Sequence, residues 1–166
     1  SSTFGLGDAG NIAIFTDNLT ASGNFNAGAN ITTDARAGSE GHAGTVDVTA
    51  SGTISLLGYA FIDSNTESLG DAGTITLTAA DIVIDGTTGT TAVRSEAQAG
   101  SSGDAGNINV YATNSIQLYD NAAAISSDTH AEGVAGTIFL DTPELQMESG
   151  QVVSTSRPGE IGRAHV

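Results

Sequence analysis

Carboxylates are the most numerous chemically reactive side chains in this chain of 166 residues, which has 19 Asp and Glu. Acid–base catalysis on a sugar needs two of them at a defined separation, often with one pKa raised by burial. Five carboxylates on strand-like segments are candidates: Asp47, Asp81, Asp85, Asp141 and Glu144. Polysaccharide lyases also use a basic residue near the acids, whereas Arg36, Arg94 and Arg157 each fall at a different strand or loop. We therefore expect no enzyme.

Nucleophilic chemistry has little support in the sequence. The chain has no cysteine, which excludes a thiolate nucleophile, a disulfide framework and Cys-ligated metals. His42 and His130 occupy different positions in the repeat described below, so they do not form a recurring base for the many Ser and Thr hydroxyls. We interpret both as solvated loop histidines.

Three aspartates suggest calcium, because each follows the first glycine of a Gly-Asp-Ala-Gly motif: Asp8, Asp71 and Asp104. Calcium takes six to eight oxygen ligands. One aspartate per repeat supplies too few of them, and the tandem nonapeptides of calcium-binding solenoids are absent. We expect weak surface calcium binding at most, and no cofactor.

The charge excludes two classes of partner. All four basic residues are arginines, and the formal net charge is −15. Nucleic acids and anionic membranes are repelled by such a chain.

The sequence also contains no candidate membrane span. Its longest apolar runs, such as Ile82 to Ile84, are far shorter than the roughly 20 residues that span a bilayer.

An eight-residue motif recurs five times and organises the whole chain. Its first copy is Gly7-Asp8-Ala9-Gly10-Asn11-Ile12-Ala13-Ile14. The second glycine of each copy is Gly10, Gly44, Gly73, Gly106 and Gly136, so the steps are 34, 29, 33 and 30 residues and average about 31. We expect these glycines at tight corners, where a positive φ or a close backbone neighbour excludes a side chain.

Each period holds three segments in which apolar residues occupy every second position, as in strands. The first segment carries the core stack Ile12, Val46, Ile75, Ile108 and Ile138. The third centres on Ile31, Ile62, Val93, Ile125 and Val153, with Thr33, Ser64, Ser95, Ser127 and Thr155 two positions on. Asn11 and Asn107 precede the core stack and could hydrogen-bond along it. Three strands cannot enclose a core alone, but stacked periods can.

The pattern therefore predicts an all-β fold, a right-handed parallel β-helix of about five coils with three short strands each. A β-sandwich would not explain the period, and a propeller blade needs four strands in about 40 residues.

The signatures Gly-Asp-Ala-Gly-Asn-Ile and Ala-x-Ile-x-Ser, from Ser1 to about Gly159, resemble the repeat region of filamentous-haemagglutinin-type exoproteins, cyanobacterial members above all. The resemblance implies a β-helical shaft for adhesion on a protein secreted to the bacterial cell surface through an outer-membrane partner. The family's amino-terminal secretion domain and Asn-rich recognition motifs do not occur in this sequence.

We expect one repeat segment over residues 1–159, a piece of a longer shaft that would continue into further coils. Residues 160–166 match no repeat and resemble the translation of a sequencing adapter. End coils without partners would expose strand edges, so end-to-end self-association is expected. The predicted function is a structural shaft segment that presents a distal binding region. The alternative is a carbohydrate-active β-helix, lyase-like, hydrolase-like or carbohydrate-binding, with an acidic strand face.

Overall fold

A computed structural model describes residues 1–130 and 132–156. The expected adapter-like segment 160–166, and Arg157 with it, lie outside the described residues. Within them there is no helix long and apolar enough to cross a membrane.

The described chain consists of short strands joined by turns and loops. The strands are β1 (Ser2–Thr3), β2 (Ile12–Thr16), β3 (Leu19–Ser22), β4 (Ala29–Ala35), β5 (Val46–Ala50), β6 (Thr53–Leu57), β7 (Ala60–Thr66), β8 (Ile75–Asp85), β9 (Thr91–Arg94), β10 (Ile108–Tyr119), β11 (Ala123–Ser126), β12 (Ile138–Asp141), β13 (Glu144–Glu148) and β14 (Gln151–Val153).

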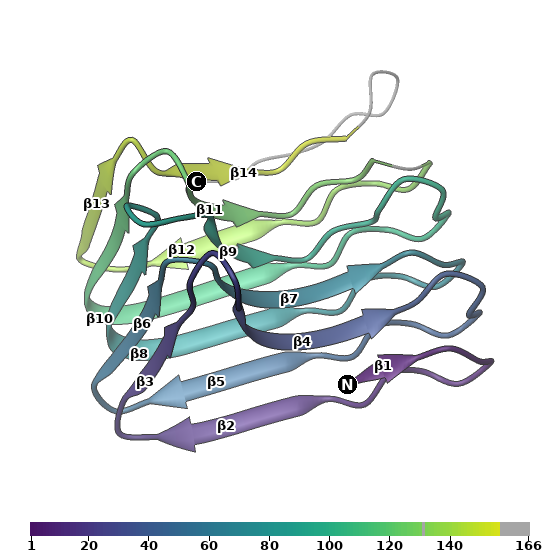
Figure 1. Cartoon of the computed structure of the whole chain (residues 1–166), viewed down its shortest axis with the longest axis horizontal. Helices are drawn as coiled ribbons and strands as arrows, with labels where there is room; N and C mark the ends of the chain where they lie inside the picture. Colours follow the sequence, from purple (N-terminus) through teal and green to yellow (C-terminus); the bar gives the residue numbers. More distant parts are fainter. Residues whose placement is uncertain (131, 157–166) are drawn as a thin grey trace.

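These strands wind into a parallel β-solenoid of about five coils, as predicted (Figure 1). One six-stranded sheet has the order β1-β4-β7-β9-β11-β14 and holds the third strand of each coil. The other sheet holds the first and second strands and pairs β12-β10-β8-β5-β2 in turn. In Figure 1 the coils rise with β4 and β7 running to the right in front of β2 and β5, which run to the left, so the coil is right-handed.

The core lies between the two sheets. It is built from apolar residues that occupy equivalent positions in successive coils and stack on one another. Ile12 pairs with Val46, Val46 with Ile75, Ile75 with Ile108 and Ile108 with Ile138, which confirms the predicted core stack. Side chains in the middle coils are fully buried, Ile75 and Ile108 among them. Each such burial contributes about 1.5–3 kcal/mol relative to exposure, so the rows of apolar residues stabilise the stack.

Two details differ from the sequence prediction. In the third and fourth coils the first two segments form one long strand each, β8 and β10, in place of two short ones. In the last coil Ile125 pairs with Val152, so the prediction of Val153 was wrong by one residue. The two adjacent valines fit the alternation of a strand equally well, and only the length of the preceding turn decides between them.

A row of buried hydroxyls joins the six-stranded sheet to the glycine corners. Ser95 Oγ donates to Gly73 O (2.7 Å) and accepts a hydrogen bond from Gly106 N (3.1 Å). Four other residues donate to a corner glycine carbonyl in the same way, namely Thr33, Ser64, Ser127 and Ser154. In the last coil this hydroxyl belongs to Ser154, so the prediction of Thr155 for that position was wrong by one residue. Each hydroxyl pairs backbone groups that would otherwise be buried without a partner.

Four of the five corner glycines, all but Gly10, are required by close backbone approach. A Cβ on Gly73 would lie 2.0 Å from Gly44 O, and one on Gly106 would lie 2.2 Å from Gly73 O. None of the five corner glycines has a positive φ, so of the two expected reasons only the close backbone neighbour applies. The coils are stacked so closely at this corner that a methyl group has no room.

Candidate functional site on the outer face of the six-stranded sheet

The five carboxylates selected from the sequence lie on the other, larger sheet and do not converge. Asp81 and Glu144 belong to one row, two coils apart, with Ser115 between them. Asp81 accepts hydrogen bonds from Ser115 Oγ (2.8 Å) and Asn114 Nδ2 (3.2 Å). The other three occupy different rows: Asp47, Asp85 and Asp141.

The calcium candidates have a structural partner each. Asp8 Oδ1 accepts a hydrogen bond from His42 N, Asp71 Oδ1 from Asp104 N, and Asp104 Oδ1 from Val134 N, each at 2.8 Å. This corner ladder ties every coil to the next. No group of three potential metal-ligating side chains lies together within residues 1–130 and 132–156.

A second polar ladder lies one position before the core stack, as the sequence suggested. Asn11 Oδ1 accepts a hydrogen bond from Thr45 N, and Asn107 Oδ1 accepts one from Thr137 N, both at 2.8 Å. Both ladders therefore use side chains to satisfy backbone donors at the corners.

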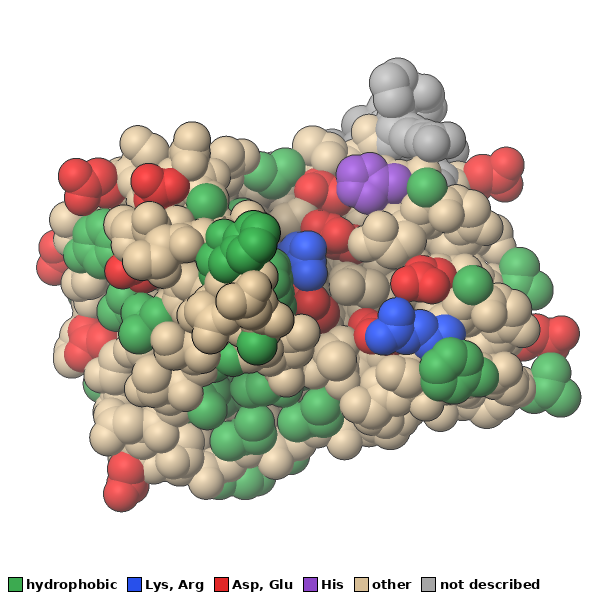
Figure 2. Space-filling view, in the orientation of Figure 1, with side chains coloured by type: hydrophobic (Ala, Val, Ile, Leu, Met, Phe, Trp, Pro, Cys, Tyr) green, Lys and Arg blue, Asp and Glu red, His purple; other side chains and the backbone are tan. Residues whose placement is uncertain are grey.

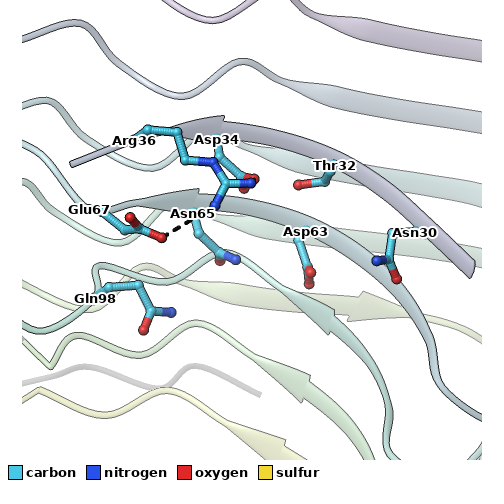
Figure 3. Close-up of a pocket in the computed structure, with 8 residues that line it drawn as sticks. All are labelled: Asn30, Thr32, Asp34, Arg36, Asp63, Asn65, Glu67 and Gln98. Carbon is cyan, nitrogen blue, oxygen red and sulfur yellow. Dashed lines mark ion pairs between the residues drawn. The ribbon is translucent and has the colours of Figure 1, made fainter. Parts of the chain in front are cut away.

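A hollow of about 210 Å³ is present on the outer face of the six-stranded sheet (Figure 3). We call it the polar hollow, lined by Asn30, Thr32, Asp34, Arg36, Asp63, Asn65, Glu67 and Gln98. The first four come from β4 and the residue after it, the next four from β7 and the segments after β7 and β9. Figure 2 shows this face, on which basic side chains lie against acidic ones.

Three carboxylates on this face are buried although they point away from the core: Asp34, Asp63 and Glu96, with exposed fractions of 7%, 8% and 9%. Arg94 holds Asp63 through two parallel hydrogen bonds, Nε to Oδ1 at 2.9 Å and the guanidinium NH2 to Oδ2 at 2.8 Å. The Arg94 guanidinium also lies 4.5 Å from the centre of the Phe61 ring. Burial raises the pKa of Asp63, and Arg94 opposes part of that increase.

The other two buried carboxylates are held by different neighbours. Asp34 Oδ2 forms an ion pair with Arg36 at 2.9 Å, and Arg36 reaches Glu67 at 3.5 Å. Glu96 accepts hydrogen bonds from Ser126 Oγ (3.0 Å) and Gln98 Nε2 (2.9 Å). The result is a charge network that spans three coils.

Sequence reasoning missed this network and also treated Arg36 and Arg94 as unrelated. Both arginines lie on the same face of the same sheet, each paired with an aspartate. A signal was present, because Asp63 and Arg94 are opposite charges one period apart, next to the buried Ser64 and Ser95. In a strand the residue next to an inward-facing serine points outward. Charged residues next to that serine in successive coils should therefore lie side by side on the outer face of the sheet.

Comparisons with protein-family models, with curated proteins and with solved structures find no match for this chain. The fold and the polar hollow describe the kind of protein this is: a parallel β-solenoid with regular coils, hydrogen-bonded corner ladders and a polar hollow on the outer face of its six-stranded sheet.

Proposed function

We propose that this chain is a structural shaft segment of a secreted bacterial surface protein, an adhesin or haemagglutinin-like exoprotein, that presents a distal binding region. The observation that supports it is the regularity of the coils. The same core position, the same buried hydroxyl and the same corner ladder recur from coil to coil. A unit that repeats in this way can be extended without limit, because each coil contacts only its neighbours.

The last coil supports the same proposal, since within residues 1–130 and 132–156 strand β13 pairs with β10 on one side and with no strand on the other. Leu145 and Met147 in β13 are 45% and 43% exposed, whereas their row partners Ile116 and Leu118 are fully buried. We propose that such ends stack on further coils or, in the isolated segment, on a second copy. Light scattering over a range of concentrations should then show growing oligomers, and a monomer at the highest concentration would contradict it.

The test of the shaft is the sequence of the genomic locus on both sides of the codons for residues 1–159. We expect further repeats of about 31 residues and, upstream, a domain for export through an outer-membrane partner. A short open reading frame with its own signal peptide and no added repeats would contradict the proposal.

A carbohydrate-active β-helix is the second candidate, and the polar hollow is the observation that favours it. Catalysis would need a carboxyl free to exchange a proton with the substrate. Both oxygens of Asp63 and of Glu96 are occupied by hydrogen bonds, and the one Asp34 oxygen without a partner is buried out of reach of a substrate. This geometry supports binding better than catalysis.

A further inference from the structure

Two aromatic side chains lie side by side on the outer face of the larger sheet, where β10 and β12 are neighbours (Figure 1). The rings of Tyr111 and Phe139 have centres 5.8 Å apart and planes inclined at 52°. Both are open to solvent, with exposed fractions of 38% and 46%. Asp141 is the register partner of Tyr111 and lies two residues after Phe139. Since alternate residues of a strand share a face, the Asp141 carboxylate lies on the same face as both rings.

A hollow of about 350 Å³ adjoins this aromatic pair. We call it the aromatic hollow, and it is lined by Thr78, Tyr111, Ala112, Thr113, Asp141 and Pro143. Within residues 1–130 and 132–156 the Asp141 carboxylate and the Tyr111 hydroxyl form no hydrogen bond or ion pair. Asp141 is exposed, so a ligand in the hollow can reach its carboxylate. The lining thus combines an aromatic ring with an accessible, unpaired negative charge.

The chain itself shows what a phenylalanine and an aspartate at this spacing can hold. In β7, on the other sheet, Phe61 and Asp63 lie two residues apart. The Arg94 guanidinium pairs with both oxygens of Asp63 and lies 4.5 Å from the centre of the Phe61 ring. Phe139 and Asp141 have the same spacing in β12, but no described arginine pairs with Asp141. The ring and the carboxylate are therefore present at β12 without the cation.

The larger sheet is also negative throughout. Its eight strands contain no arginine, lysine or histidine. They carry six carboxylates: Asp47, Asp81, Asp85, Asp141, Glu144 and Glu148. The two arginines that the structure describes, Arg36 and Arg94, are both paired with aspartates of the other sheet. This face therefore repels anions and attracts cations.

Two other classes of ligand fit the aromatic hollow less well. Calcium takes six to eight oxygen ligands, and no group of three potential metal-ligating side chains lies together within residues 1–130 and 132–156. A neutral saccharide would cover the Tyr111 ring but leave the charge of Asp141 without a counter-charge. A planar guanidinium matches both groups, because it pairs with a carboxylate through two hydrogen bonds and stacks on an aromatic ring.

We propose that the aromatic hollow binds a guanidinium group, supplied by an arginine side chain of a basic peptide. The group pairs with the Asp141 carboxylate and lies over the Tyr111 ring, which Phe139 supports from the side. Pro143 contacts the methylene groups of the same arginine. The site goes beyond the shaft function and does not rest on it, because β8, β10, β12 and the corner after β12 supply every group. It faces outward, so stacked coils leave it open.

The test is an NMR titration of the whole chain, at pH 7 and low salt, with three peptides that differ in one side chain. They are acetyl-Gly-X-Gly-amide with arginine, lysine or citrulline at X, and citrulline replaces the guanidinium by a neutral urea of similar shape. We expect the arginine peptide to shift the amides of residues 109–113 and 139–142, with a dissociation constant of about 1–10 mM, as suits one exposed ion pair and one ring contact. The lysine peptide should bind about twofold more weakly or worse, and the citrulline peptide at least about fivefold more weakly.

Three variants locate the contact. Asp141→Asn removes the charge and keeps the side-chain shape, so binding of the arginine peptide should weaken at least about fivefold. Tyr111→Thr removes the ring and should weaken binding at least about threefold. The fold accepts threonine there, because Thr49 and Thr78 occupy the same row in the preceding coils. Asp47→Asn is the matched control, since it removes the same charge from an exposed position of the same face in a distant coil. It should change binding by less than about twofold.

Four results would overturn the proposal. One is the absence of shifts at residues 109–113 and 139–142 with the arginine peptide at about 50 mM. Another is equal binding of the lysine or the citrulline peptide, which would make the guanidinium irrelevant. A third is an equal loss of binding in Asp47→Asn and Asp141→Asn, which would assign the attraction to the whole face. The last is a neutral saccharide, cellotetraose, that shifts these amides when the arginine peptide does not, which would make the Tyr111 ring a sugar-binding surface.

Discussion

His42 accepts a hydrogen bond at Nδ1 from the backbone N–H of Asp71 over 2.9 Å. It thereby occupies the position in the corner ladder that Asp8, Asp71 and Asp104 hold in other coils. An imidazole nitrogen and a carboxylate oxygen are both hydrogen-bond acceptors, and the acceptor is what this position requires. The interpretation of His42 as a solvated loop residue was therefore incomplete, since its exposed ring also joins two coils.

Removing that acceptor should destabilise the stack. We expect His42→Ala to lower the free energy of unfolding by about 1 kcal/mol, because Asp71 N loses its protein partner. His42→Asn supplies an amide oxygen and should restore most of the loss. Urea unfolding measures both, with His130→Ala as the control on an exposed histidine. Equal stability of His42→Ala and the unmodified chain would contradict the ladder.

The buried hydroxyl row should be more costly to disrupt. Ser95→Ala leaves Gly106 N and Gly73 O without their side-chain partner in a fully buried place, so we expect a loss of about 1–3 kcal/mol. Ser102→Ala, on an exposed serine of the adjoining loop, should change the unfolding free energy by less than about 0.5 kcal/mol. Similar effects of the two variants in urea unfolding would show that the row contributes nothing.

Much of this architecture could be predicted from the repeat alone. Apolar alternation fixed which side chains stack in the core, and the recurring Gly-x-Ala-Gly located the corners. The sequence could not distinguish Val152 from Val153, because a turn of unknown length precedes them. It also gave no account of Asp34, which lies opposite Asn65 of the next coil and is buried there beside its ion-pair partner Arg36. Relations between coils are set by three-dimensional packing, which one period of sequence does not contain.

The corner glycine Gly73 and Gly7, the first glycine of the first motif copy, allow a contrasting pair of substitutions. Gly73→Ala would place a Cβ 2.0 Å from Gly44 O, so we expect a loss of about 3 kcal/mol or more as the coils are forced apart. Gly7→Ala, in the first copy of the motif, has nothing within 4 Å of its Cβ and should be near neutral. Thermal unfolding of both variants measures the difference, and equal melting temperatures would refute close approach as the reason for the glycine.

Asp63 should titrate abnormally. Burial raises its pKa, so the ¹³Cγ resonance of Asp63 should have its titration midpoint above the ordinary value of 3.8. A raised carboxyl pKa means that the folded chain binds this proton more tightly. Asp63 therefore favours folding below pH 3.8, and this contribution is lost as the pH rises through the folded pKa.

Arg94 gives the control for that titration. Because Arg94 lowers the pKa of Asp63 against the effect of burial, Arg94→Gln should move the midpoint higher still. A midpoint at or below 3.8 in the unmodified chain, or a fall on removal of Arg94, would contradict the assignment.

If the coils are equivalent units of an extensible shaft, the protein should accept further coils inserted between existing ones. Three additional copies of residues 70–102, placed after Ser102, supply three more coils with matching corners and core rows. We expect a folded protein that is longer by about 14 Å in small-angle X-ray scattering, at about 4.8 Å per coil. An insert that stays unfolded, or a folded chain with unchanged length, would contradict it.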